Sequence, residues 1–254
     1  MQQALPDRLG RVGRLKVGGR ALLKRLPEPA KVPLRRLRGK HNEELAFWRE
    51  QFEANGARFS SAETSAYYER LMLAMAEEPT ADFLAGKIVA DFGCGPRGSL
   101  VWAPNALLRI GIDVLADRYA DEFPNTIRSH GMIYVKSTEK IIPLPSDFVD
   151  VLFTLNAIDH VDDFPAMCSE IIRVIRPGGL FIGSFNLNEP WNLTEPQRLN
   201  EADIDLHLLD HLDIRSYRAS RQGQGYEPFL TGDTEYEPGE TGYAWVKATK
   251  PASA

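Results

Sequence analysis

Residues Val89–Leu100, VADFGCGPRGSL, join a short apolar run to a turn that contains three glycines. The glycines at 93, 95 and 98 have the spacing G-x-G-x-x-G. At the carboxyl end of a strand, such glycines let the backbone come close to a nucleotide-like ligand. The spacing alone fits two kinds of ligand, a dinucleotide bound through its pyrophosphate or a different nucleotide-like cofactor.

The residues around the glycines favour the second kind of ligand. Asp91 stands two residues before the first glycine, and Pro96 and Pro104 interrupt the segment that follows. Only about a dozen residues separate the first two predicted strands, close to the shortest possible crossover, which leaves little room for the helix that usually faces a pyrophosphate. A carboxylate here suits a positively charged ligand such as S-adenosylmethionine, which carries an ammonium group and a sulfonium. Asp113, at the end of the second predicted strand, could accept hydrogen bonds from the ribose hydroxyls of either a dinucleotide or S-adenosylmethionine, so it does not distinguish the two ligands.

The rest of the chain predicts an α/β fold with a doubly wound parallel sheet. Short apolar runs indicate strands at 87–92, 107–113, 132–136, 148–155 and 179–186, with a sixth at 213–220 and a seventh at 241–250. Before the fifth strand, a helical stripe of apolar residues is expected to end at RPGG, residues 176–179. The spacing of apolar residues also predicts two helices between 41 and 86.

Charge divides the chain unevenly, which suggests an organisation in three parts. Residues 1–40 hold twelve Lys or Arg against two acids, a net +10, whereas residues 41–254 hold 18 basic and 33 acidic residues, a net −15. We expect a basic extension at 1–40, a helical cap at 41–86 and a ligand-binding domain at 87–254. Leucines between the basic residues fit a helix on an anionic membrane surface, and a solvated tail is the equal alternative. The extension contains no aromatic residue on which a base could stack, which argues against nucleic-acid binding.

Cysteine content and hydropathy indicate a cytoplasmic protein. The two cysteines, Cys94 and Cys168, form neither a disulfide framework nor a C-x-x-C metal signature. No apolar run approaches the ~18 residues that a membrane-spanning helix needs.

Four segments in order resemble the class I S-adenosylmethionine-dependent methyltransferases, of the type 11 kind: DFGCGPRGS, GIDVL, STEKIIPLPSDFVDVLFTLNAIDHVDD and EIIRVIRPGGLFIGSF. The resemblance implies an enzyme with a Rossmann-like seven-stranded sheet, its last strand antiparallel, and an N-terminal helical cap. It implies that Asp91, Gly93, Cys94 and Gly95 line the methionyl part of S-adenosylmethionine, Asp113 the ribose, and Ser137, Thr138 and Glu139 the adenine edge, with Asn156 completing the cofactor site. Ser137 stands where the family usually has an acid, and Arg97, where a small residue is common, is expected on the surface.

The acceptor of the methyl group is indicated less directly. The family builds its acceptor site from the cap and the loops after strands four and five, which nominates Trp48, Tyr67, Tyr68 and Trp191. The chain is similar to bacterial methyltransferases of surface-glycan and small-molecule pathways, so a hydroxyl on a sugar or lipid-linked glycan is the first choice. A soluble secondary metabolite, a quinone precursor, and a cofactor-binding protein without turnover are the alternatives.

The stretch NAIDHVDD supplies the candidate catalytic groups. His160 is a candidate general base, and Asp159 beside it a candidate for orienting the acceptor hydroxyl. Asn156 stands where some quinone-pathway enzymes have a metal-binding acid, so no metal is expected.

Overall fold

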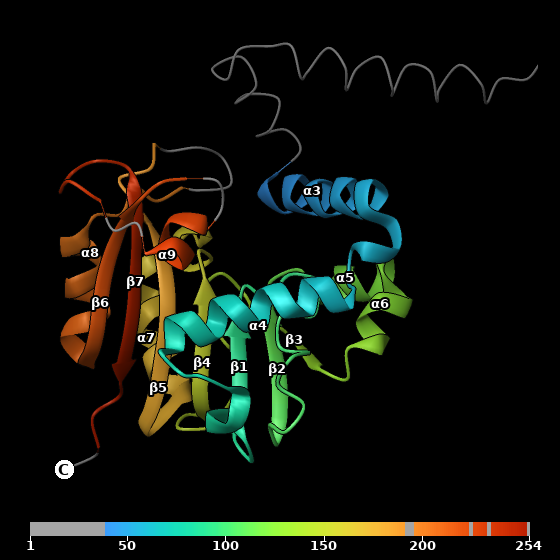
Figure 1. Ribbon diagram of the computed structural model, residues 1–254, viewed down its shortest axis with the longest axis horizontal. Coiled ribbons are helices and arrows are strands. Elements are labelled where there is room, and N and C mark those ends of the chain that lie inside the picture. Colours follow the sequence, from blue (N-terminus) through green and yellow to red (C-terminus); the bar gives the residue numbers. More distant parts are fainter. Residues whose placement is uncertain (1–38, 191–195, 224–225, 233–234, 253–254) are drawn as a thin grey trace, which may run out of the picture.

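The computed structural model describes residues 39–190, 196–223, 226–232 and 235–252, so the proposed basic extension up to residue 38, and Trp191, lie outside the described residues. A mixed sheet of seven strands, in the order β3-β2-β1-β4-β5-β7-β6, forms the centre of the protein (Figure 1). The strands are β1 Ile88–Phe92, β2 Leu108–Asp113, β3 Ile133–Lys136, β4 Val149–Leu155, β5 Ile175–Leu187, β6 Asp213–Arg221 and β7 Gly242–Thr249. All seven lie where the sequence predicts them.

The directions of the strands confirm the predicted topology. Strands β1 to β5 pair in parallel, and β7 runs antiparallel to both β5 and β6. The order reverses between β1 and β4, and open α/β sheets bind ligands outside the carboxyl ends of the strands at such a point.

The sequence predicts that the segment RPGG ends the preceding helix, but in the structure RPGG belongs to the following strand. Helix α7, Phe164–Val174, ends before it, and β5 begins at Ile175. Val149 pairs with Ile175 and Val151 with Leu180, so the extra residues form an irregularity in β5. Proline is tolerated there because such a position makes no regular ladder hydrogen bond.

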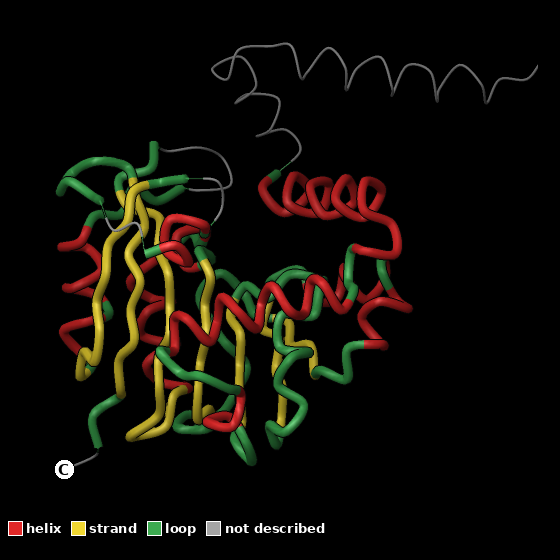
Figure 2. The backbone as a smooth tube through the Cα atoms, viewed as in Figure 1, coloured by secondary structure: helices red, strands yellow, loops and turns green. Residues whose placement is uncertain are grey.

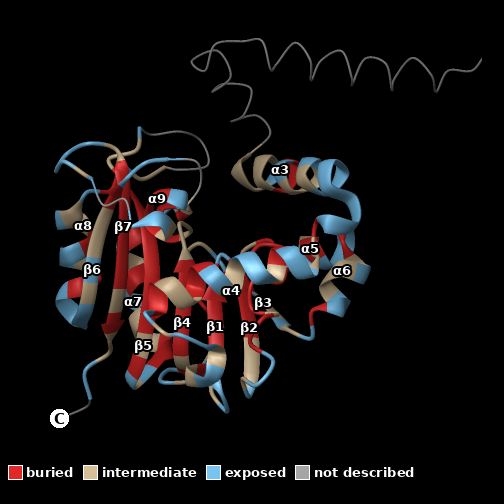
Figure 3. Ribbon diagram, in the orientation of Figure 1, coloured by how far each residue is buried: buried red, intermediate tan, exposed pale blue. Residues whose placement is uncertain are grey.

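Helices cover both faces of the sheet (Figure 2). The helices are α3 Lys40–Asn55, α4 Ala62–Ala76, α5 Ala116–Glu122, α6 Pro124–Ser129, α7 Phe164–Val174, α8 Glu201–His207 and α9 Glu227–Thr231. Alternate strand residues face opposite sides, so Val89 joins the core under α4 while Ala90 joins the core under α7. Figure 3 shows the resulting band of buried residues along the central strands.

The two predicted helices between 41 and 86 take different places. Helix α4 lies against the sheet, where Leu71, Met72 and Met75 are buried in the same core as Val89. Helix α3 lies beyond one end of the strands (Figure 1) and buries Leu45 with residues of α5 and its flanks. Only α3 is therefore placed as a cap over the carboxyl ends of the strands, and we call it the cap helix.

The first crossover is as short as the sequence predicts. Residues 93–107 form turns without a helix, and β2 follows at Leu108. Leu100 and Trp102 from this segment are buried in the core under α4. The glycine turn after β1 is instead held by the end of β2, where the Ile112 carbonyl accepts from the Gly93 amide at 2.8 Å and the Asp113 carboxylate accepts from the Gly95 amide.

Candidate functional site

A cavity of about 800 Å³ lies at the carboxyl ends of β1, β2 and β4, under the cap helix. Of the predicted cofactor residues, it is lined by Asp91, Gly93, Cys94, Gly95, Asp113, Ser137, Thr138, Glu139 and Asn156. Every cofactor residue nominated from the sequence therefore faces one cavity. These residues come from four strand ends, and the reversal of strand order brings those ends together.

Asp91 is a buried carboxylate with unused hydrogen-bonding capacity. Its side chain is 2% exposed, and the Ser99 hydroxyl donates to Oδ2. Within the described part of the chain, Oδ1 has no hydrogen-bond partner. Burial raises the pKa of Asp91 to about 7, the Ser99 hydrogen bond opposes that rise, and the nearby Asp113 adds to it. A positively charged group would satisfy Oδ1, so the position fits the ammonium group of S-adenosylmethionine.

Asp113 joins the glycine turn to the second strand and to the cap helix. Its Oδ2 accepts from the Gly95 amide at 3.0 Å and its Oδ1 from the Leu115 amide at 2.8 Å. The Tyr119 hydroxyl also hydrogen-bonds this carboxylate and is in turn hydrogen-bonded to Trp48. Burial raises the pKa of Asp113, against these hydrogen bonds.

The glycines meet protein atoms as well as the cavity. Gly95 has φ +57°, and a Cβ built there would lie 2.7 Å from Cζ2 of Trp48. At Gly93, with φ +76°, a Cβ would lie 2.1 Å from the Ala157 Cβ. The sequence predicts that these glycines allow the cofactor to approach the backbone closely. The structure adds a second reason, because any side chain at 95 would displace the indole of the cap helix.

The loop after β3 binds the cap helix. Glu139 accepts from Lys40 Nζ at 3.2 Å, contacts His41 Nε2 at 2.7 Å and accepts from the Asp162 amide at 3.3 Å. We call Lys40, His41 and Glu139 the clasp. Burial raises the pKa of Glu139, but His41 and Lys40 outweigh it and bring the pKa to about 2. Glu139 lines the cavity, and its carboxylate also holds the cap helix. The sequence places Lys40 in the basic extension, but in the structure Lys40 is the first residue of the cap helix.

The neighbouring Thr138 is also engaged within the protein. Its hydroxyl accepts from the Ile141 amide at 2.9 Å, and the Ser137 amide donates to the Asp113 carbonyl at 3.2 Å. Ser137 is buried. The three residues of the predicted adenine edge therefore line one wall of the cavity, where the Thr138 hydroxyl and the Ser137 amide are engaged within the protein.

The segment after β4 brings Asn156 and His160 to the cavity. Asn156 has φ +45°, and its Nδ2 donates to Asn186 Oδ1 at 2.8 Å while its own Oδ1 is buried without a partner among the described residues. His160 ends the short helix η3, Ile158–His160, and lines the cavity. Asp159 is 2% exposed and is not one of the residues that line the cavity. Of the two candidate catalytic residues, His160 is therefore the one that lines the cavity.

The cavity continues beyond the cofactor residues to an aromatic wall. Tyr67 and Tyr68 form one ring pair with centroids 5.9 Å apart, and Tyr226 and Tyr243 form another with the same separation. All four line the cavity, as does Trp48. Tyr226 and Tyr243 were not predicted, because they lie far along the chain from every recognised motif.

Arg97 and Glu44 lie elsewhere than the sequence alone indicates. Arg97 is not a surface residue: its Nε donates to the Phe59 carbonyl at 3.0 Å and its Nη2 to Thr64 Oγ1 at 3.1 Å. Glu44 lines the cavity and was overlooked. Helical spacing could have revealed Glu44, because Lys40, Glu44 and Trp48 follow one another at intervals of four and so share one face of the helix.

Comparison with known proteins identifies the domain. The family described as "Methyltransferase domain" matches residues 90–183, which include every predicted cofactor residue. A ubiquinone biosynthesis O-methyltransferase of Xanthomonas oryzae pv. oryzae is 31% identical over 111 residues, 41% of this chain and 45% of the relative. A malonyl-[acyl-carrier protein] O-methyltransferase of Enterobacter lignolyticus is 31% identical over 93 residues, 36% of each chain. The chain spans about half the length, or less, of these relatives.

Solved structures share the fold at low sequence identity. An S-adenosylmethionine-dependent methyltransferase from Mesorhizobium loti has a TM-score of 0.51 and 16% identity, covering 69% of this chain and 95% of that one. The [4+2]-cyclase SpnF has a TM-score of 0.55 and 19% identity, covering 73% and 81%. The seven-stranded sheet, the cavity and the family match agree, and residues 90–183 form a methyltransferase domain with the fold of the class I S-adenosylmethionine-dependent methyltransferases.

Proposed function

We propose that the chain transfers the methyl group of S-adenosylmethionine to a hydroxyl on a sugar or a lipid-linked glycan. The observation that carries the proposal is the continuity of the cavity, which runs from the cofactor residues past His160 to the tyrosine wall. One end fits the cofactor and the other offers a second ligand a place beside it. Fold alone would not suffice, because a neighbour with this fold is described as a cyclase.

The cofactor supplies a methyl group activated on a sulfonium. Asp91 would hold its ammonium group, and Asp113 its ribose. The protein contributes most by holding the acceptor oxygen against the methyl group, an effect worth up to ~7–11 kcal/mol. The acceptor hydroxyl must also lose its proton, and the imidazole of His160 in the cavity wall is the group that would receive it.

The tyrosine wall supports a ring-shaped acceptor. The apolar faces of sugar rings pack well on aromatic side chains, and the tyrosine hydroxyls offer hydrogen bonds at the edges. Tyr68 and Tyr226 are held neutral because burial raises the pKa of each hydroxyl. A planar quinone precursor or soluble metabolite is the second candidate, and the O-methyltransferase of ubiquinone biosynthesis among the relatives favours it.

The test incubates the full chain with methyl-labelled cofactor and with fractions of a bacterial extract, followed by mass identification of the labelled product. Label in a glycan or lipid-linked glycan supports the first choice, and label in a soluble aromatic product supports the second. Binding of S-adenosylhomocysteine without a labelled product in any fraction would contradict methyl transfer and favour a cofactor-binding protein without turnover.

We further propose that the basic extension brings the enzyme to an anionic membrane surface, from the cytoplasmic side. Within the described residues no helix is long and apolar enough to span a membrane. Each Lys or Arg near an anionic surface contributes about 1 kcal/mol, so the extension should bind vesicles that contain anionic lipid and release them in high salt. A chain that begins at Gly39 keeps the clasp and should remain unbound. Equal flotation of the two chains would refute the proposal.

A further inference from the structure

The cap helix itself contributes carboxylates to the wall of the cavity, and Glu44 is one of them. Glu44 lines the cavity, and its side chain is 20% exposed. Burial raises the pKa of Glu44, the positive charges of His160, Lys40 and His41 oppose that rise, and Asp113 adds to it. A carboxylate kept away from water is costly, so its presence beside reactive groups points to a function.

Glu44 faces the candidate base. Its Oε1 lies 3.9 Å from Nδ1 of His160, an ion-pair distance slightly longer than a hydrogen bond. His160 comes from the end of η3 and Glu44 from the cap helix, so two separate elements bring the pair together. Hydrogen bonds between catalytic groups are often long without ligands and shorten when substrate binds.

We propose that Glu44 is a positioning residue for His160. Building on the proposed methyl transfer, Glu44 holds the proton of the imidazole on Nδ1, which leaves Nε2 as the basic nitrogen. The acceptor oxygen forms a bond to the methyl carbon while the bond between that carbon and sulfur breaks, and its electron pair stays on sulfur. The hydroxyl proton passes to Nε2. Glu44 stays ionised and stabilises the imidazolium until solvent takes the proton.

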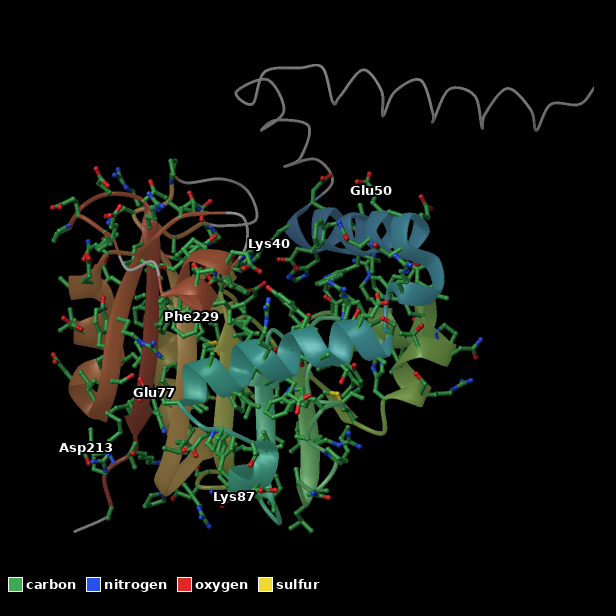
Figure 4. All side chains as sticks on the ribbon, in the orientation of Figure 1. Lys40, Glu50, Glu77, Lys87, Asp213 and Phe229 are labelled. Carbon is green, nitrogen blue, oxygen red and sulfur yellow. The ribbon has the colours of Figure 1, made fainter. Side chains whose placement is uncertain are left out.

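The arrangement makes the base depend on the cap helix. Lys40 and His41 fasten the start of this helix to Glu139, and Leu45 is buried against α5. Glu44 lies between these attachments, so the His160 pair is complete only when the cap helix is in place. Figure 4 shows Lys40 at the start of the helix on the side toward the sheet, and Glu50 on its outer side.

The tautomer of His160 tests the proposal without any acceptor. In the full chain with S-adenosylhomocysteine at pH 8, ring ¹⁵N NMR should show His160 with its proton on Nδ1, the signals being assigned with His160→Gln. In Glu44→Leu, which keeps the bulk but removes the acceptor, the proton should move to Nε2, the form that neutral histidine prefers in water. Native protein with its proton on Nε2 would overturn the proposal even if the leucine variant did not fold.

Turnover gives the second readout once an acceptor is known. Glu44→Gln and Glu44→Leu should lower kcat about ten- to a hundredfold, below the 10²–10⁴-fold that a general base contributes, with KM for the cofactor nearly unchanged. The matched control is Glu50→Gln on the exposed side of the same helix, which should change neither readout. Unchanged kcat and tautomer in both Glu44 variants would refute the role of Glu44. A correct tautomer in a protein that methylates no acceptor would instead refute the proposed function.

Discussion

Replacing Asp91 by Asn should stabilise the free protein and weaken its affinity for the cofactor. Burial raises the pKa of this carboxyl from 3.8 to about 7. Between these two values the folded protein binds a proton that the unfolded chain has lost, so stability falls as pH rises, and the loss is complete above pH 7. A shift of about 3 pKa units corresponds to roughly 4 kcal/mol at 1.36 kcal/mol per unit. Asparagine carries no charge and escapes this penalty.

The pH dependence isolates the contribution of Asp91 from other effects of the substitution. Asparagine also leaves part of a buried amide without a partner, which offsets some of the gain at every pH. The difference between the variant and the native protein should nevertheless grow by about 3 kcal/mol from pH 5 to pH 8, because about 2 units of the shift lie in this interval. Urea unfolding of both proteins at several pH values measures it. A difference that stays constant with pH would refute the reasoning.

Cofactor binding should show the opposite trend. Below pH 7 Asp91 must release its proton before it can accept the ammonium group, so the affinity of the native protein for S-adenosylhomocysteine should rise roughly a hundredfold between pH 5 and pH 8. Asp91→Asn should bind weakly and without this dependence. Titration calorimetry on both proteins decides the matter, and equal affinity at pH 8 would exclude Asp91 from the cofactor site.

The remaining predictions concern the base, the clasp and the glycine turn. His160→Ala should lower kcat about 10²–10⁴-fold with near-normal affinity for S-adenosylhomocysteine; unchanged turnover with the true acceptor would make His160 structural. Glu139→Gln should lower the pKa of His41, which the hydrogen bond that His41 donates to Glu139 raises against burial, and should open the cap helix to proteolysis; the native contact contributes stability at low pH that is lost as pH rises through the raised pKa of His41. Gly95→Ala should destabilise the fold by about 1–3 kcal/mol, because its Cβ meets Trp48 and its φ is positive; chemical unfolding measures this, and an alanine variant as stable as the native protein would contradict the close packing of the indole.

The seven strands were predictable because each signal is local. A buried strand of a doubly wound sheet reads as a short apolar run, and the runs at 87–92 and 148–155 differ from β1 and β4 only by a residue or so at their ends. Asp91, the glycines and Asp113 were predictable as one site for a related reason. They stand at the carboxyl ends of neighbouring parallel strands, and these ends meet at one edge of the sheet.

What chain folding alone decided is how distant segments meet. Sequence spacing assigned 41–86 to one cap, but α4 packs on the sheet, with Tyr67 and Tyr68 in the cavity wall, and only α3 lies beyond the ends of the strands. Glu139 was assigned to the cofactor, yet the approach of Lys40 and His41 from 98 or 99 residues away makes it the attachment of the cap helix. Tyr226 and Glu44 reach the cavity in the same way. Local patterns determine which elements form, whereas contacts between elements depend on the packing of the whole chain, and these contacts build the part of the cavity that lies beyond the predicted cofactor residues.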